Sequence, residues 1–252
     1  MADTIIRFDH VCRSFDGRPV LQDLSLSIER GTFLTVIGRS GCGKTTALRL
    51  VNGLISADSG RVLVQGKDVA DTDPAALRRG IGYAIQNVGL FPHMTVEKNI
   101  AYEPAISKSP FWKGAERRRR AAELLQSVGL EPDLAGRYPR ELSGGQRQRV
   151  GIARALAAQP DILLMDEPFG AVDEITRRQL QDEILRLHQE RGITILFVTH
   201  DIEEALKLGT RVLVMEEGRV VQFAPPSTVM DSPATPFAAQ LVRRSRDFAP
   251  RQ

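Results

Sequence analysis

The pattern of hydrophobic and polar positions changes period along the first fifty residues, and each change marks a predicted element. Side chains alternate between apolar and polar over Ile5 to Val11 and Val20 to Ile28, on either side of an Asp16-Gly17 turn. This is typical of two antiparallel strands. The run Thr32 to Ile37 is apolar and β-branched, stops at glycine and serine, and is followed by a helical stretch, Lys44 to Asn52. The chain is therefore predicted to begin with an antiparallel lobe, followed by a strand, a glycine-rich loop and a helix.

The second half of the chain alternates between strand and helix. After an apolar run at 81–85, the region up to about residue 138 shows only helical patterns, at 96–101 and 115–128. The next predicted elements are a helix at 146–158, a strand at 161–165, a helix at 176–190, a strand at 193–199, a helix at 202–208 and a hairpin at 211–223. The alternation predicts an α/β fold with a mostly parallel sheet, a helical subdomain over about 88–158 and a short helical tail over about 225–252.

Composition limits the classes of function. The chain has 252 residues, of which 42% are hydrophobic, enough for one sizeable core. Its apolar runs are far shorter than the roughly 20 residues of a membrane helix, and its start does not resemble a secretory signal, so we expect a cytoplasmic protein. Two cysteines, Cys12 and Cys42, indicate reduced thiols.

Charge gives no support to nucleic acid as a partner. The 34 cationic side chains are nearly balanced by 31 anionic ones. One dense basic run, Arg117 to Arg120, lies in a helical pattern. We interpret it as a solvated helix face, or as a contact with a partner or with lipid headgroups.

One segment carries a phosphate-binding motif. It reads Gly38-Arg39-Ser40-Gly41-Cys42-Gly43-Lys44-Thr45, which fits G-x-x-x-x-G-K-[ST], and it lies between a buried strand and a helix as this motif requires. Its glycines let backbone N–H groups converge on phosphate oxygens, and the helix N-terminus, which includes Thr46, adds partial positive charge. We expect Lys44 to reach the β- and γ-phosphates, Thr45 to bind Mg²⁺, and Cys42 to be a small filler rather than a reactive thiol.

Two further segments have the chemistry of a nucleotide site. Asp166 and Glu167 follow an apolar run, so both acids emerge at the carboxyl end of a predicted strand. One could hold Mg²⁺ and the other polarise water, although either alone could equally be a helix cap. The segment Ser143-Gly144-Gly145-Gln146 begins an arginine-rich helix and predicts a second anion-accepting helix N-terminus, with an ordinary cap and turn as the alternative.

Together these motifs resemble the nucleotide-binding subunits of ABC transporters, and the resemblance extends from end to end of the chain. Leu142 to Gln146 is similar to the signature motif of that family. The resemblance implies two domains paired head to tail, as a homodimer or with a second ABC ATPase subunit. Ser143, Gly144 and Gly145 of one copy would then face the γ-phosphate of the ATP held by the other, so that a monomer binds ATP but hydrolyses it poorly.

The resemblance also implies roles for individual residues. Phe15 resembles the aromatic that stacks on adenine, although the family more often has tyrosine there and a hairpin core residue is the alternative. Gln86 resembles the glutamine that contacts Mg²⁺ and water and relays contact from the membrane partner. Glu167 resembles the catalytic base and His200 the switch histidine. Asp173 resembles the D-loop aspartate, although its context Gly-Ala-Val-Asp departs from the commoner Ser-Ala-Leu-Asp.

Within that family, the segments 84–100 and 166–177 look most like bacterial importers of osmoprotectants such as glycine betaine, choline or carnitine. This implies ATP and Mg²⁺ as cofactors, transmembrane permease subunits as direct partners and a solute-binding protein as an indirect one. It also implies a peripheral location on the cytoplasmic face of the inner membrane. Residues 1–252 would form a single ABC ATPase domain, and we expect no added C-terminal regulatory domain of the kind that senses ionic strength in some members.

Other functions stay open at this point. They are an importer of another small solute, a soluble ABC ATPase acting on nucleic acid or cluster assembly, a kinase or GTPase with the same loop, and a nucleotide-binding module without turnover. Kinases and GTPases do not explain Leu142 to Gln146 or Gln86, and an idle module requires Glu167 to be unused.

Overall fold

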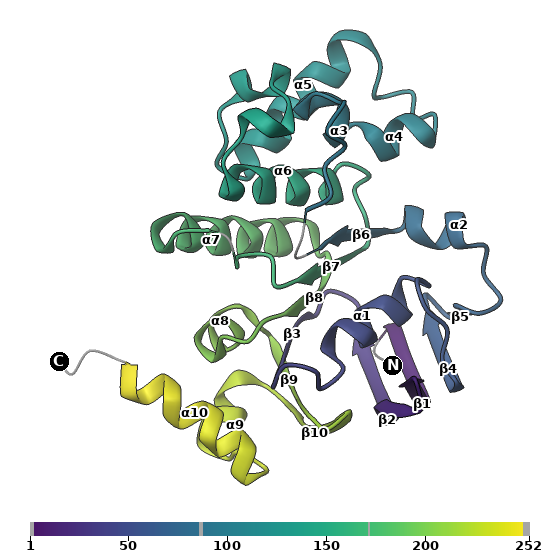
Figure 1. Cartoon of the computed structure of the whole chain (residues 1–252), viewed down its shortest axis with the longest axis vertical. Coiled ribbons are helices and arrows are strands. Elements are labelled where there is room, and N and C mark those ends of the chain that lie inside the picture. Colours follow the sequence, from purple (N-terminus) through teal and green to yellow (C-terminus); the bar gives the residue numbers. More distant parts are fainter. Residues whose placement is uncertain (1–2, 86–87, 171, 249–252) are drawn as a thin grey trace. The chain divides into compact units, whose positions relative to one another are not determined.

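The computed structural model describes residues 3–85, 88–170 and 172–248, and Figure 1 labels its helices and strands. The chain divides into two compact units. The first unit comprises Met1–Leu77 and Thr194–Gln252, and the second comprises Arg78–Ile193. Within the described residues, every helix is too short or too polar to cross a membrane.

An antiparallel sheet forms one layer of the first unit. Its strands are β1 (Thr4–Phe15), β2 (Arg18–Glu29), β4 (Ser59–Val64) and β5 (Lys67–Asp68), in the order β2-β1-β4-β5. The predicted turn joins β1 to β2, and Asp16 and Gly17 both have positive φ, 49° and 76°, as a tight two-residue hairpin requires. The predicted antiparallel lobe is confirmed, and β4 and β5 enlarge it.

The second layer of the first unit is built around β3 (Phe33–Gly38). This strand is buried along its whole length and pairs in parallel with β8 (Thr194–Val198) and β9 (Arg211–Glu216). Strand β10 (Arg219–Ala224) pairs with β9 in the antiparallel sense. The helices of this unit are α1 (Lys44–Val51), α8 (Ile202–Leu208), α9 (Pro226–Asp231) and α10 (Pro236–Phe248). The predicted order of strand, loop and helix is therefore confirmed.

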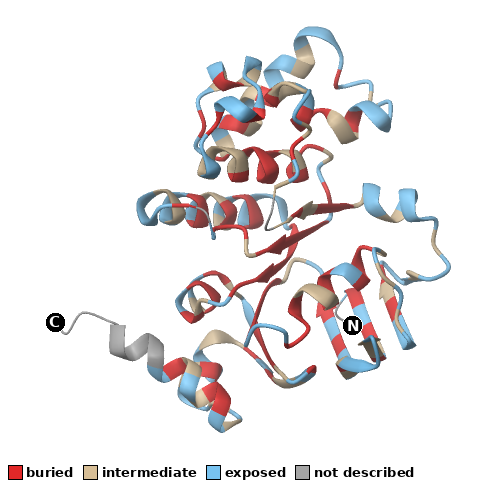
Figure 2. Cartoon of the chain, viewed as in Figure 1, coloured by how far each residue is buried: buried red, intermediate tan, exposed pale blue. Residues whose placement is uncertain are grey.

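The second unit contains a parallel strand pair and most of the helices. Strand β6 (Ile81–Ala84) pairs with β7 (Ile162–Asp166). Its helices are α3 (Val96–Ile100), α4 (Tyr102–Ile106), α5 (Gly114–Ser127), α6 (Gly144–Leu156) and α7 (Glu174–Arg191), with 3-10 turns η1 (Pro132–Gly136) and η2 (Pro139–Glu141). Helix α2 (Pro74–Arg79) lies where the chain passes from the first unit to the second. Both strands are largely buried, whereas α7 carries an exposed face (Figure 2).

The basic run lies on α5 and is largely neutralised by neighbouring carboxylates. Arg119 donates a hydrogen bond to Glu116 at 2.6 Å and another to Glu123 at 2.5 Å. Arg120 also donates to Glu116, at 2.9 Å. The two arginines hold the pKa of Glu116 at about 2, chiefly through the hydrogen bond from Arg119. These contacts favour the solvated helix face over a binding site for polyanions.

A buried amide organises the segment between β6 and α3. Asn99 is 0% exposed, and its Oδ1 accepts from the backbone N–H of Phe91 at 2.8 Å. Its Nδ2 lies 3.2 Å from Phe91 O, 3.1 Å from Met94 O and 3.0 Å from Thr95 O. The donors and the acceptor of this amide are all used. One side chain thus joins the Phe91 end of the loop to its Met94 and Thr95 end.

Replacing this amide tests its contribution to stability. We expect Asn99→Ala to lower the free energy of unfolding by about 2 to 3 kcal/mol, because the Phe91 N–H and several carbonyls lose their partner. Asn99→Asp keeps the acceptor but turns a carboxylate toward three carbonyl oxygens, so we expect it to be at least as destabilising. Urea denaturation measures both, and an unchanged midpoint for either variant would contradict the assigned role.

Candidate functional site

The glycine-rich loop connects the end of β3 to the start of α1 and depends on close backbone approaches. A Cβ on Gly38 would lie 2.3 Å from the carbonyl oxygen of Met215 on β9. Gly43 has φ of 98°, and a Cβ there would lie 2.8 Å from Val20 O. Only glycine fits at these two positions, because any side chain would collide with backbone.

Lys44 lies inside the loop that precedes it. Its side chain is 6% exposed, and its Nζ donates to Gly38 O at 2.7 Å and to Arg39 O at 3.0 Å. The N–H of Cys42 donates to the same Arg39 carbonyl at 3.2 Å. The loop is thus folded around an ammonium group at a helix N-terminus, and Gly43, in the N-cap position, has no side chain that could compete for an anion.

Cys42 is the buried cysteine of this loop. A Cβ on Gly38 would come within 2.6 Å of its Sγ, so the thiol fills the space beside that glycine. Burial raises the pKa of the Cys42 thiol, and the nearby Lys44 only partly offsets this. A raised pKa disfavours the thiolate, which agrees with the interpretation of Cys42 as a small filler.

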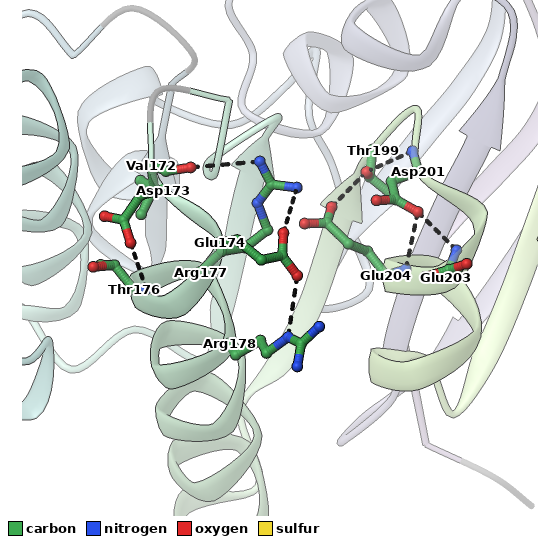
Figure 3. Close-up of polar contacts among 10 residues, drawn as sticks. All are labelled: Val172, Asp173, Glu174, Thr176, Arg177, Arg178, Thr199, Asp201, Glu203 and Glu204. Atoms are coloured by element: carbon green, nitrogen blue, oxygen red, sulfur yellow. Dashed lines mark hydrogen bonds and ion pairs between the residues drawn. The ribbon is translucent and has the colours of Figure 1, made fainter. Parts of the chain in front are cut away.

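His200 follows β8, the parallel neighbour of β3 in the first unit. Thr199 donates from its N–H to Val36 O on β3 at 3.2 Å, and from its hydroxyl to Glu204 at 2.7 Å. The hydroxyl of Thr199 also accepts from the N–H of Asp201 at 3.0 Å, and Asp201 caps α8 (Figure 3). The residues on both sides of His200 are therefore held in place. Because parallel β3 and β8 end at the same sheet edge, His200 lies at the edge where β3 enters the phosphate-binding loop.

Phe15 ends β1 beside the hairpin turn of the same unit. Its side chain is 39% exposed, and the guanidinium of Arg13 lies 4.7 Å from its ring centroid. The exposure disfavours the alternative of a hairpin core residue.

In the second unit, Asp166 and Glu167 lie where β7 ends. Asp166 is buried, and Glu167 has φ of 45°, a backbone conformation that non-glycine residues rarely adopt. Parallel β6 ends at the same edge, because Ala84 pairs with Met165. Gln86, the next predicted site residue, lies outside the described residues. A strained acid at a strand end is typical of functional sites.

The predicted oxygen ligands fit a magnesium ion by their chemistry. The hydroxyl of Thr45 and the carboxylate of Asp166 are hard donors, and Mg²⁺ commonly takes one or two protein ligands while keeping several waters. Within the described part of the chain, no three His, Cys, Asp or Glu side chains gather in a way that could hold a metal ion. A magnesium site with few protein ligands does not need such a gathering.

The signature-like segment forms the N-terminus of α6. The N–H of Gln146 donates to Ser143 Oγ at 3.2 Å, and the N–H of Ser143 donates to Gln146 Oε1 at 2.8 Å. Leu142 is buried and its carbonyl accepts from Arg147 at 2.6 Å. Gln146 therefore maintains the cap, whereas Ser143 and Gly144 are exposed and the hydroxyl proton of Ser143 is not used in the reciprocal bond.

Asp173 caps α7 in the same unit. Its carboxylate accepts from the N–H of Thr176 at 3.0 Å (Figure 3). This backbone hydrogen bond holds the pKa of Asp173 below its ordinary value. Glu174 in the first turn accepts from Arg178 at 3.1 Å.

Three residues on one face of α6 were not singled out from the sequence. Gln148 Nε2 lies 3.5 Å from Ile85 O, and Arg154 Nη1 donates to Gly89 O at 2.8 Å. Between them, a Cβ on Gly151 would lie 2.6 Å from Val88 Cγ1. Gln148, Gly151 and Arg154 recur at every third position and so lie on one face of the helix. This spacing is the sequence signal that could have identified them. The helix that starts at the signature-like segment thus holds the segment that follows β6.

A glycine-rich loop after a buried parallel strand, with acids at the end of a second buried strand, defines a P-loop nucleotide-binding protein. Residues 21–170 match the model of the family described as ABC transporter, and the chain belongs to this family.

Curated relatives cover nearly the whole chain. It is 45% identical over 243 residues to the carnitine transport ATP-binding protein OpuCA of Listeria monocytogenes, covering 96% of this chain and 60% of the relative. It is 44% identical to the glycine betaine/carnitine/choline transport ATP-binding protein OpuCA of Bacillus subtilis, covering 96% and 63%. It is 47% identical over 241 residues to the glycine betaine uptake system ATP-binding protein YehX of Escherichia coli, covering 96% and 77%. The chain spans about three fifths of the length of the first two relatives.

Solved structures agree with the fold. The dimeric structure of MJ0796, a bacterial ABC transporter cassette, has a TM-score of 0.83 at 33% identity, covering 88% of this chain and 99% of that one. A dimeric post-hydrolysis state of the same cassette bound to ADP and Pi has a TM-score of 0.82 at 32% identity, with the same coverage.

The state of Cys42 generates a chemical prediction. In a Cys12→Ala background, we expect iodoacetamide at pH 7.5 to alkylate Cys42 at least about tenfold more slowly in the folded protein than in urea, since burial keeps the thiol protonated and covered. Because the raised pKa moves thiolate formation to higher pH, the folded protein should react faster as the pH rises toward 9. Mass spectrometry of timed samples measures the rates, and equal rates in folded and unfolded protein would contradict this description.

Proposed function

We propose that this chain is the ATP-binding and ATP-hydrolysing subunit of an ABC importer, and that the solute is a quaternary-amine osmoprotectant such as glycine betaine. The observation that carries the proposal is the buried Lys44 ammonium, enclosed by its loop at a helix N-terminus without a capping side chain. The choice of solute is supported by relatives named for glycine betaine, choline and carnitine transport.

The chemical groups of the predicted site have distinct roles in this proposal. Lys44 leaves the carbonyls of Gly38 and Arg39 to bind the β- and γ-phosphates, and the loop N–H groups receive the remaining oxygens. Thr45, Asp166 and Gln86 hold Mg²⁺, which when bound supplies charge stabilisation to the phosphates. Glu167 accepts a proton from the attacking water, and His200 donates to the γ-phosphate.

A second copy completes the site. The exposed Ser143 and Gly144 lie at the N-terminus of α6, where they are available to the phosphates of a nucleotide held by another subunit. The similarity to cassettes solved as dimers supports this pairing. The second subunit is either another copy of this chain or a different ABC ATPase subunit.

The catalytic assignment is tested by Glu167→Gln, which keeps the shape of the side chain but removes its basicity. We expect the steady-state ATPase rate of the purified chain to fall by about 100-fold or more, the lower range for loss of a general base. Because ATP is then not consumed, ATP with Mg²⁺ should drive this variant into dimers in size-exclusion chromatography. Equal ATPase rates for Glu167→Gln and the unmodified chain would refute the enzymatic role. A Glu167→Gln protein that has lost ATPase activity but stays monomeric with ATP and Mg²⁺ would refute the paired site.

The permease is proposed to contact the second unit beside the segment that follows β6. An open cavity of about 290 Å³ is lined there by aromatic and basic side chains, among them Tyr83, Phe91, Tyr102 and Arg154. The rings of Phe91 and Tyr102 are 4.3 Å apart between centroids. Its aromatic lining and the charged residues Arg78, Glu103 and Arg154 suit a short amphipathic segment of a membrane partner, which would hold the chain on the cytoplasmic face of the membrane.

A charge placed in this cavity tests the docking proposal. We expect Tyr102→Asp to keep ADP binding while losing co-purification with the permease, because the carboxylate makes burial of an apolar partner costly. Ile106→Asp is the matched control, since Ile106 lies on the same helix, is 63% exposed and does not line this cavity. If Tyr102→Asp recovers as much permease as the unmodified chain does, this cavity is not the docking site.

A further inference from the structure

The C-terminal helix contacts the phosphate-binding loop. The guanidinium of Arg39, the second residue of that loop, lies 5.1 Å from the ring centroid of Phe237 in the first turn of α10. The same Arg39 supplies the carbonyl that accepts from both Lys44 Nζ and the N–H of Cys42. The side chain of Arg39 is thus directed to α10, while its backbone takes part in the cradle around Lys44.

Phe237 is in turn held in a fixed place. It is 7% exposed and packs in an apolar cluster with Ile37, the residue before the loop, and Ile202, in the first turn of the helix that follows His200. Ala238 and Val242 of α10 belong to the same cluster. Phe237 therefore belongs to the same buried cluster as residues that flank both segments of the first unit that are proposed to contact the phosphates.

The approach to α10 is also fixed. Gln222 on β10 donates from Nε2 to Ser232 O at 3.0 Å and accepts on Oε1 from the N–H of Ala234 at 2.9 Å. Thr235 then caps α10 by accepting from the N–H of Ala238 at 3.1 Å. Because Gln222 is buried and uses both ends of its amide, the connection between α9 and α10 has little freedom.

We propose that Phe237 is a positioning residue of the nucleotide site, which holds Arg39 through a cation–π contact and so preorganises the phosphate-binding loop. This inference rests on the proposed ATP site and adds the C-terminal tail to it. A loop fixed before the nucleotide arrives loses less conformational freedom on binding. The contact therefore favours nucleotide affinity and leaves the chemical step unchanged.

The test separates this role from general stability. Phe237→Leu keeps an apolar side chain but removes the ring, and we expect ADP with Mg²⁺ to bind about two- to fivefold more weakly in isothermal titration, the worth of an exposed cation–π contact. The KM for ATP should rise by the same factor while kcat stays unchanged. Phe237→Tyr keeps the π face and should restore the affinity to that of the unmodified chain.

A double-mutant cycle with Arg39 makes the coupling specific. We expect Phe237→Leu to have no further effect on ADP affinity once Arg39→Met is present, because the partner of the ring is already gone. If Phe237→Leu fails to fold, Phe237→Met takes its place, since methionine also keeps an apolar side chain and removes the ring. Phe223→Leu is the control: Arg211 lies 5.9 Å from that ring, away from the loop, so its ADP affinity should equal that of the unmodified chain.

The outcomes distinguish this inference from the proposed function. Folded Phe237→Leu protein with unchanged affinity, or additive effects of the two changes, would overturn the positioning role and leave the ATP site intact. Absence of ADP and ATP binding by the unmodified chain would instead refute the ATP site itself.

Discussion

Strand β3 is hydrogen-bonded on both sides and buried along its length, and the organisation of the first unit depends on it. Its parallel pairing with β8 brings the end of that strand, and therefore His200, to the edge where the loop begins. Its pairing with β9 brings the carbonyl of Met215 against Gly38. A single buried strand thus fixes the start of the loop, the histidine and the glycine that allows the chain to turn.

Helix α6 has the corresponding role in the second unit. Its N-terminus is the signature-like segment, and its body packs on β6 so closely that a Cβ on Gly82 would lie 2.3 Å from Ala155 O. The same helix bonds the segment after β6 through Gln148 and Arg154. Burial lowers the pKa of Arg154, so this contact is made by a poorly hydrated guanidinium. The proposed permease contact and the proposed nucleotide contact are therefore joined by one helix, α6.

The sequence predicted what is encoded by local pattern. Helix α8 was expected at its observed bounds, and the loop was recognised because strand, glycines and helix are consecutive. The addition of β4 to β1 was missed, because pairing of Ile6 with Val64 depends on residues far apart in the chain. The Arg39–Phe237 contact was missed for the same reason. Asn99 reads as one more polar residue in a helical stretch, and only burial reveals its function.

The caps of four helices that begin at motif residues separate structural from anion-accepting N-termini. Helices α7 and α8 are capped by Asp173 and Asp201, and each has a further carboxylate in its first turn, so their partial positive charge is already satisfied by fixed negative charge. Helices α1 and α6 start instead at Gly43 and Ser143, and their first turns, Lys-Thr-Thr and Gly-Gly-Gln, carry no carboxylate. A phosphate approaching α7 or α8 would be repelled, whereas one approaching α1 or α6 meets N–H groups and no like charge. Among these four helices, the two whose N-termini carry no carboxylate, one in each unit, are the two that the proposed paired ATP site uses: one to hold the nucleotide and one to close over the nucleotide held by the other subunit.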